Sequence, residues 1–256
     1  MLEAITFDFW DTIAIDDSDE AKRRARGLPS KADARTAMFV EYIGRKHPRV
    51  AAKRAAEAYA AANARFGNEW HNGHHTPAVS TRLSYAFEYL DLLPGPGHYT
   101  RLLAEIDELV REIEVMEVRI PPDIAPGVEN ALYLLSREYK LGIISDTIHT
   151  HGRGLRHLLN QQGLLPFFSA FIFSDEVGVS KPETAIFRYA AEALDAPPRA
   201  IAHVGDRESN DIIGPRMAGF RTVLFTGIVD RGSARTRADA ICRHYIDLPA
   251  ILQRLR

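Results

Sequence analysis

Apolar runs of strand length recur along this chain of 256 residues, and helix-like segments separate them in its second half. The runs occupy residues 3–9, 141–145, 170–173, 200–204 and 221–225. Short, continuously apolar runs are typical of buried strands, and their alternation with helices is typical of βαβ units. We therefore expect an α/β fold whose strands are parallel and whose helices cover both faces of the sheet.

Two of the connecting segments have the apolar period of an amphipathic helix. Residues 126–139 begin with a Pro near the expected helix start, and a second helix can begin at Pro182. The first segment places Val128, Leu132, Leu135 and Tyr139 on one face, and the second places Ile186, Phe187, Ala190 and Leu194. Both stripes predict helices that pack against the sheet.

Residues 17–114 contain no convincing strand and are helical in character. Leu102, Ile106, Leu109 and Ile113 repeat at helical spacing, and the Ala-rich stretch 50–64 has high helix propensity. We predict a Rossmann-like parallel-sheet core formed by residues 1–16 and 115–256. An all-helical cap, residues 17–114, is inserted into it, and the Pro-rich segment 120–127 suits a hinge.

The overall composition excludes several classes of partner. The 32 basic and 34 acidic side chains nearly balance, so the charge indicates neither nucleic acid nor a membrane surface. A single cysteine, Cys242, cannot form an internal disulfide. The N-terminus does not read as a signal peptide, and no apolar run approaches the roughly 20 residues that span a bilayer. We expect a cytoplasmic protein of undetermined oligomeric state.

Two of the apolar runs end in acidic residues. ITFDFWDT, residues 5–12, carries Asp8, and HVGDRESND, residues 203–211, carries Asp206 and Asp211. Because ligands bind outside the carboxyl ends of parallel strands, we expect these three acids to converge. Three carboxylates repel one another unless a cation lies between them, and Mg²⁺ commonly binds few carboxylates together with substrate phosphate. The sequence predicts a Mg²⁺-dependent site for a small phosphate ester.

Segments in a fixed order along the whole chain resemble the motifs of the haloacid dehalogenase superfamily of hydrolases. The first motif of that family is a strand that ends in Asp-x-Asp-x-Thr, and a Ser or Thr ends the second. The third is a Lys, usually followed by Pro, and the fourth is Gly-Asp with a later acid. The matching residues are Asp8 and Thr12, then Ser145, then Lys181, then Asp206 and Asp211. The resemblance implies a core and helical cap of this family and a hydrolase activity.

The resemblance and the chemistry of the side chains together assign roles. Asp8 is the candidate nucleophile, which would form an aspartyl-phosphate. Lys181 supplies a compact positive charge to the phosphate and to Asp8, and Ser145 can donate to a phosphoryl oxygen. The candidate phosphate contacts are Thr12, Trp10, Ser145, Asp146 and Lys181. The candidate metal ligands are Asp8, the backbone carbonyl of Trp10, Asp206 and, directly or through water, Asp211, with Asn210 as a further oxygen contact.

Position 10 departs from the family pattern. Phosphatases of the family have a second Asp there, which protonates the leaving oxygen, whereas this chain has Trp10. Such acid-base help is typically worth about 10²- to 10⁴-fold. Asp11 is a candidate substitute, although the alternation of a strand end would aim it elsewhere. Our hypothesis is a phosphatase that favours good leaving groups, or one whose acid comes from the cap or the substrate.

Trp10 and Thr12, the residues on either side of Asp11, have simpler interpretations as well. For Trp10 we favour a packing role that closes the site, and for Thr12 a structural role in the turn after Asp8.

Two other functions stay open. The 2-haloacid dehalogenases of the same superfamily have Tyr at the position of Trp10, need no metal, and attack carbon. Against this alternative, the chain retains both Asp206 and Asp211, and Asp146 follows Ser145 where dehalogenases have Asn. The second of these alternatives is a catalytically weak protein that binds phosphate and metal without turnover. The sequence favours the phosphatase but does not identify its substrate.

A histidine-rich segment lies within the predicted cap. Trp70 is followed by His71, His74 and His75, which together could hold a transition metal. Gly73 and Pro77 interrupt a regular helix there, so fixed ligand spacing is not assured. We interpret the segment as a polar loop that faces the substrate entrance.

Overall fold

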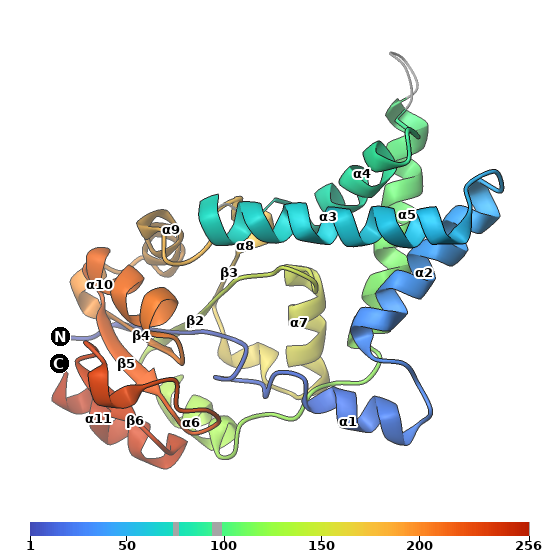
Figure 1. The fold of residues 1–256 in the computed structure, drawn as a ribbon. Coiled ribbons are helices and arrows are strands. Elements are labelled where there is room, and N and C mark those ends of the chain that lie inside the picture. Colours follow the sequence, from blue (N-terminus) through green and yellow to red (C-terminus); the bar gives the residue numbers. More distant parts are fainter. Residues whose placement is uncertain (74–76, 94–98, 256) are drawn as a thin grey trace.

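A single parallel sheet forms the centre of the protein in the computed structural model, which describes residues 1–73, 77–93 and 99–255 (Figure 1). Its six strands lie in the order β3-β2-β1-β4-β5-β6, and every pair is parallel. They are β1 Ala4–Phe7, β2 Lys140–Ser145, β3 Ala170–Phe173, β4 Ile201–Gly205, β5 Arg221–Phe225 and β6 Ala240–Cys242. The five predicted strands are confirmed. The sequence reading missed β6, which is a three-residue edge strand too short to give an apolar run.

Helices cover both faces of the sheet, as the sequence predicted. The helices α6 Val128–Leu135, α7 Gly152–Gln161 and α11 Leu248–Arg254 pack on one face, and α9 Thr184–Leu194 on the other. The shorter helices α8 Ser174–Val177 and α10 Gly214–Met217 complete the connections. Both predicted apolar stripes are buried. The first helix ends at Leu135 rather than at 139, although Tyr139 still packs in the core.

In the described residues between β1 and β2, a block of five helices follows β1 and has its own apolar core. These helices are α1 Ser18–Ala25, α2 Lys31–Lys46, α3 Ala52–Gly73, α4 Val79–Tyr89 and α5 Tyr99–Val118. Phe39, Tyr42 and Phe87 are fully buried in this core, and the predicted α5 stripe from Leu102 to Ile113 is also buried. Helix α5 continues past residue 114 to Val118. We refer to residues 18–118 as the α1–α5 block, which extends away from the sheet in Figure 1.

No helix in the described part of the chain combines the length and apolar character needed to cross a membrane.

Strand order places the ends of β1 and β4 at the centre of the sheet. Strand β1 has β2 on one side and β4 on the other, so the chain direction of the connections reverses there. Phe7, the last residue of β1, is in register with Ile143 and Val204. The residues that follow these strands therefore emerge together at the switch point, where open α/β sheets bind their ligands.

Candidate active site

Lys181 joins two carboxylates at the end of β1. Its Nζ lies 2.6 Å from Asp8 Oδ1 and 2.6 Å from Asp211 Oδ1, and all three side chains are buried. Asp8 directly follows β1, whereas Asp211 lies in the helical turn Glu208–Ile213 after β4. A buried cation between two buried anions is consistent with the cost of leaving any of the three unpaired.

A buried histidine supports the far side of Asp211. His203 Nε2 lies 3.2 Å from Asp211 Oδ1, and His203 Nδ1 lies 2.9 Å from Thr6 Oγ1. Burial lowers the pKa of His203, whereas the hydrogen bond to Asp211 opposes this shift. Because a carboxylate only accepts, Nε2 is the donor in the contact with Asp211. The sequence reading missed His203, although a histidine within an apolar strand was a signal.

The glycine before Asp206 is required by the side chain of Asp211. A Cβ atom added to Gly205 would lie 2.4 Å from Asp211 Cγ, closer than real Cβ contacts. The second oxygen of Asp211, Oδ2, accepts the backbone N–H of Arg207 at 3.0 Å. Asp211 is therefore packed directly over the backbone of the β4 turn, with hydrogen-bond donors on both of its oxygens.

Three carboxylates converge as predicted. One oxygen from each of Asp8, Asp206 and Asp211 lies within 4.8 Å of the others. Asp206 Oδ1 is buried and has no hydrogen-bond partner among the described residues. An unpartnered buried carboxylate oxygen is costly unless a cation or donor reaches it, so this oxygen set fits a hard divalent cation.

The sequence reading also missed Arg231, which lies in the loop after β5. Its Nε donates to Asp206 Oδ2 at 2.6 Å, and its Nη2 donates to Asp11 Oδ2 at 2.6 Å. Asp11 has a positive φ of 53° and is not among the residues that line the cavity beside Asp8. The side chain of Asp11 is thus aimed at Arg231, as the strand-end argument expected, and no motif in the sequence pointed to the arginine.

The charges of the cluster are strongly coupled. Burial raises the pKa of Asp8, and the nearby Asp211 and Asp206 add to this effect while Lys181 opposes it. Burial also raises the pKa of Asp206, with a further contribution from Asp211. For Asp211, burial is outweighed by Lys181 and His203, which hold its pKa below the ordinary value. Positive charge added to the cluster would lower the pKa values of both Asp8 and Asp206.

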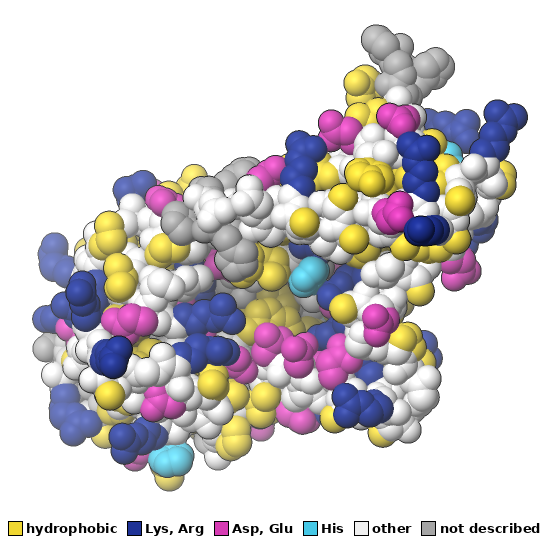
Figure 2. Space-filling view, viewed as in Figure 1, with side chains coloured by type: hydrophobic (Ala, Val, Ile, Leu, Met, Phe, Trp, Pro, Cys, Tyr) yellow, Lys and Arg dark blue, Asp and Glu magenta, His cyan; other side chains and the backbone are white. Residues whose placement is uncertain are grey.

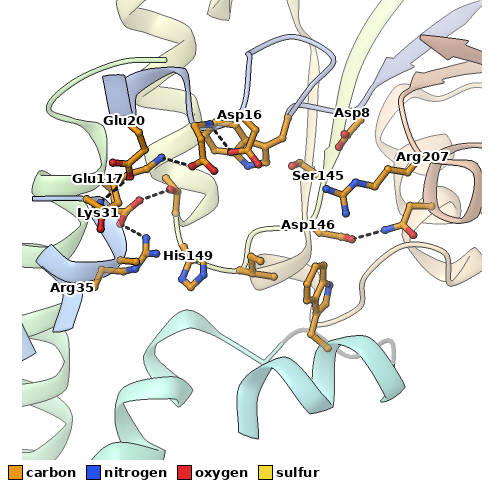
Figure 3. Close-up of a pocket in the computed structure, with 18 of the residues that line it drawn as sticks. Asp8, Asp16, Glu20, Lys31, Arg35, Glu117, Ser145, Asp146, His149 and Arg207 are labelled. Carbon is orange, nitrogen blue, oxygen red and sulfur yellow. Dashed lines mark hydrogen bonds and ion pairs between the residues drawn. The ribbon is translucent and has the colours of Figure 1, made fainter. Parts of the chain in front are cut away.

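A cavity of about 560 Å³ opens beside Asp8, between the sheet and the α1–α5 block (Figures 2 and 3). Core residues on its wall include Asp8, Trp10, Ser145, Asp146 and Lys181. The opposite wall includes Lys31, Arg35, Trp70 and Glu117 from the α1–α5 block. The volume suits a small metabolite.

Ser145 presents a free hydroxyl to this cavity. The side chain is fully buried at the end of β2, and its Oγ has no hydrogen-bond partner in the described structure. Asp146 lies beside it and is fully engaged, because Oδ1 accepts the Lys181 backbone N–H at 3.0 Å and Oδ2 accepts Asn210 Nδ2 at 3.2 Å. Ser145 is therefore placed to donate to a ligand, whereas Asp146 links the segments that carry Ser145, Lys181 and Asn210.

The other predicted residues divide between the cavity and the core. Trp10 lines the cavity and packs edge-on against Phe9, at 4.8 Å between ring centroids. Thr12 is fully buried away from the cavity lining, and its carbonyl accepts the Tyr245 hydroxyl at 3.0 Å. This placement fits a turn-forming role for Thr12.

Part of the predicted histidine segment cannot be placed. Helix α3 ends at Gly73, and Trp70 near its end lines the cavity. His74 and His75 lie outside the described residues, as does the side chain of His71.

The fold and this arrangement define a class. A parallel α/β sheet carries Asp8, Lys181 and a cluster of three acids at the ends of its central strands. The model of the haloacid dehalogenase-like hydrolase family matches residues 2–219, and the chain belongs to that family.

Individual relatives agree with this assignment. The chain is 32% identical over 117 residues to haloacid dehalogenase-like hydrolase domain-containing protein 3 of Danio rerio, a match that covers 44% of this chain and 47% of the relative. It is 42% identical over 77 residues to a phosphoserine phosphatase of Thermus thermophilus, covering 30% of this chain and 29% of that protein. The chain thus spans less than half the length of these curated relatives.

A solved structure shows the same fold over the whole chain. The 2-haloacid dehalogenase from Pseudomonas syringae pv. Tomato DC3000 has a TM-score of 0.66 and 20% sequence identity, with 100% of both chains covered.

Proposed function

We propose that the protein is a Mg²⁺-dependent phosphatase of small phosphate monoesters that works through an aspartyl-phosphate on Asp8. One observation carries the proposal. Two buried oxygens beside Asp8, Asp206 Oδ1 and Ser145 Oγ, have no partner among the described residues. A cation satisfies the first and a phosphoryl oxygen satisfies the second, which are the two groups that an incoming phosphate ester and its metal would bring.

The chain's own residues then have defined tasks. Asp8 attacks phosphorus, and the leaving oxygen departs from the opposite side in line. Lys181 holds Asp8 on one oxygen and places its positive charge beside the phosphoryl group. Ser145 donates its hydroxyl to a phosphoryl oxygen. Water then attacks the aspartyl-phosphate and regenerates Asp8 with release of inorganic phosphate.

Asp8 and Asp206 would hold the cation, with the predicted backbone carbonyl of Trp10 as a third contact. Asp211 can contribute through the same cluster, although both of its oxygens already accept hydrogen bonds. When bound, Mg²⁺ neutralises charge on the carboxylates and on the transferring phosphoryl group.

The cavity above the cluster supports a helical cap and a small substrate. Side chains of the α1–α5 block face Asp8 across the cavity, so this block would serve as the predicted cap over residues 17–114 and would exclude water and select the substrate. The phosphoserine phosphatase relative supports phosphoryl chemistry. We include phosphoserine among the substrates to test.

Carbon-halogen hydrolysis is the second candidate, because the aromatic Trp10 lines the cavity at the position where dehalogenases have Tyr. A metal-free reaction leaves the buried Asp206 beside Asp8 without a task. We therefore rank this reaction below phosphate hydrolysis.

A substrate screen with and without a chelator tests the proposal. The purified protein is incubated with phosphate monoesters and with 2-haloacids, and the release of phosphate and of halide is measured. We expect phosphate release that EDTA abolishes and excess Mg²⁺ restores, and that Asp8→Asn eliminates. Halide release insensitive to EDTA would select the dehalogenase. Binding of Mg²⁺ and inorganic phosphate without any turnover would select the binding protein.

A further inference from the structure

The structure leaves the proposed phosphatase without an acid at the usual place. Trp10 lines the cavity, but an indole N–H does not give up a proton to an alkoxide. Asp11, the next residue, forms an ion pair in which its Oδ2 lies 2.6 Å from Nη2 of Arg231. Another acid on the cavity wall could supply the proton for the leaving group.

Most carboxylates on that wall already have partners. Glu117 pairs with Arg35 at 2.6 Å, and both oxygens of Asp146 accept hydrogen bonds. Asp17 lies 3.8 Å from Lys31 Nζ, and Glu20 accepts the backbone N–H of Lys31 at 2.8 Å. These contacts hold the four acids in structural roles.

Asp16 is different. It lines the same cavity as Asp8 and Ser145, and in Figure 3 it lies between Asp8 and the more distant Glu20. Its Oδ1 accepts the backbone N–H of Asp17 at 3.0 Å, and within the described residues its carboxylate forms no ion pair. The side chain is open to the cavity, so it can exchange protons with a ligand there.

The turn after Asp8 explains how a residue eight positions later returns to the site. The backbone N–H of Asp11 donates to the Ala14 carbonyl at 2.7 Å, and Ala14 forms a bridge with Trp10. The backbone N–H of Asp16 then donates to Asp11 Oδ1 at 3.1 Å. Since Arg231 fixes Asp11, a continuous set of contacts runs from the core to Asp16.

The electrostatic surroundings of Asp16 suit proton transfer. The pKa of Asp16 is raised, first by desolvation and then by the negative charges of Asp17 and Asp11, while Lys31 opposes the shift. A carboxyl group with a raised pKa retains its proton nearer to neutral pH, as a general acid requires.

We propose that Asp16 is the general acid and base of this enzyme, in place of the acid that Trp10 replaces. The role rests on the proposed phosphatase function. As Asp8 forms its bond to phosphorus, the bond from phosphorus to the leaving oxygen breaks, and protonated Asp16 gives its proton to that oxygen. The Asp16 carboxylate then takes a proton from water while the water oxygen attacks the aspartyl-phosphate, which releases inorganic phosphate and restores both acids.

The dependence on the leaving group tests this role. An alkoxide needs a proton in order to leave, whereas 4-nitrophenolate leaves as a stable anion. For Asp16→Asn we expect kcat on glycerol phosphate to fall by about 10²- to 10⁴-fold, with a much smaller loss on 4-nitrophenyl phosphate. Inhibition by inorganic phosphate should stay near that of the unaltered protein, because Asn keeps the shape of the site.

Three further variants make the test specific. Asp16→Glu should recover part of the activity on glycerol phosphate. Asp123→Asn is the matched control, because its exposed carboxylate pairs with Lys22 outside the cavity lining. Asp17→Asn carries the same substitution on the neighbouring acid, and its selective loss should be much smaller than that of Asp16→Asn, because Asp17 acts on Asp16 only through its charge.

Each outcome decides the question. The role of Asp16 is overturned if Asp16→Asn loses activity equally on both substrates or loses none. It is also overturned if Asp17→Asn, and not Asp16→Asn, shows the selective loss. In each of these cases the proposed phosphatase function still stands. If the unaltered protein releases phosphate from neither ester, the proposed function fails and this role fails with it. Thermal unfolding of Asp16→Asn separates a folding defect from a catalytic one, and the Glu variant then carries the test.

Discussion

Arg231 holds one oxygen of Asp206 and leaves the other free. The guanidinium donates to Oδ2 at 2.6 Å, whereas the buried Oδ1 has no partner among the described residues. A carboxylate fixed in this way presents a single oxygen to the cluster formed with Asp8 and Asp211. The loop after β5 therefore takes part in building the site, together with the four segments that the motifs identified.

Replacing Arg231 should weaken metal binding. In Arg231→Ala we expect the dissociation constant for Mg²⁺ to rise by roughly 10-fold, because residues that orient metal ligands typically contribute 10- to 100-fold. Asp11 offsets the guanidinium charge, so orientation should outweigh the loss of repulsion. Titration calorimetry with Mg²⁺ measures the change, and Arg235→Ala, an exposed arginine of the same region, is the control. Tighter binding in Arg231→Ala would show that the arginine competes with the cation.

Ser145 should be dispensable for folding and needed for phosphate binding. Ser145→Ala removes a buried hydroxyl that has no partner, so the free energy of unfolding should stay unchanged or rise. The affinity for inorganic phosphate should fall. Ser174→Ala is the contrasting variant, because Ser174 Oγ accepts the backbone N–H of Thr147 at 2.8 Å and its loss should cost about 1–3 kcal/mol. Urea unfolding and phosphate titration measure both effects; a large destabilisation by Ser145→Ala would contradict the assignment.

Two glycines should respond to alanine in opposite directions. Gly205→Ala places a Cβ 2.4 Å from Asp211 Cγ, so the free energy of unfolding should fall by roughly 1–3 kcal/mol and Mg²⁺ binding should weaken as Asp211 shifts. Gly44 lies within α2 with no atom near an added Cβ, and Gly44→Ala should stabilise the protein by roughly 0.5–1 kcal/mol. Denaturant unfolding compares the two, and a neutral Gly205→Ala would show that the β4 turn relaxes freely.

His149 should make the protein less stable in mild acid. Its pKa is held well below the ordinary value of 6.5, first by burial and then by the positive charges of Arg82, Arg35 and Lys31. The unfolded chain therefore binds a proton near pH 6.5 that the folded chain does not, so the stability present above this pH declines as the pH falls below it. His149→Gln should lessen the decline between pH 7.5 and 5.5 in urea unfolding curves. Parallel curves for the two proteins would exclude His149 as a source.

The sequence by itself determined the fold class and identified most of the residues that meet in the candidate site. Buried strands have a strong local signature, so all five apolar runs became strands, and the acids at their ends met because parallel strands end on one edge. Asp8, Ser145, Lys181, Asp206 and Asp211 were each identified from their own segment of chain. The position of Trp10 on the cavity wall was also expected from the first motif.

Only the tertiary structure decided which groups complete that site. Arg231 contacts Asp11 and Asp206 across long sequence separations, and His203 contacts Asp211 from within a strand whose pattern reads simply as apolar. Asp16 reaches the cavity because a turn returns the chain toward Asp8. A local pattern records the period of an element and the residue at its end. It contains no information on which distant side chain fills the space beside a charge, because packing and desolvation across the whole fold decide that.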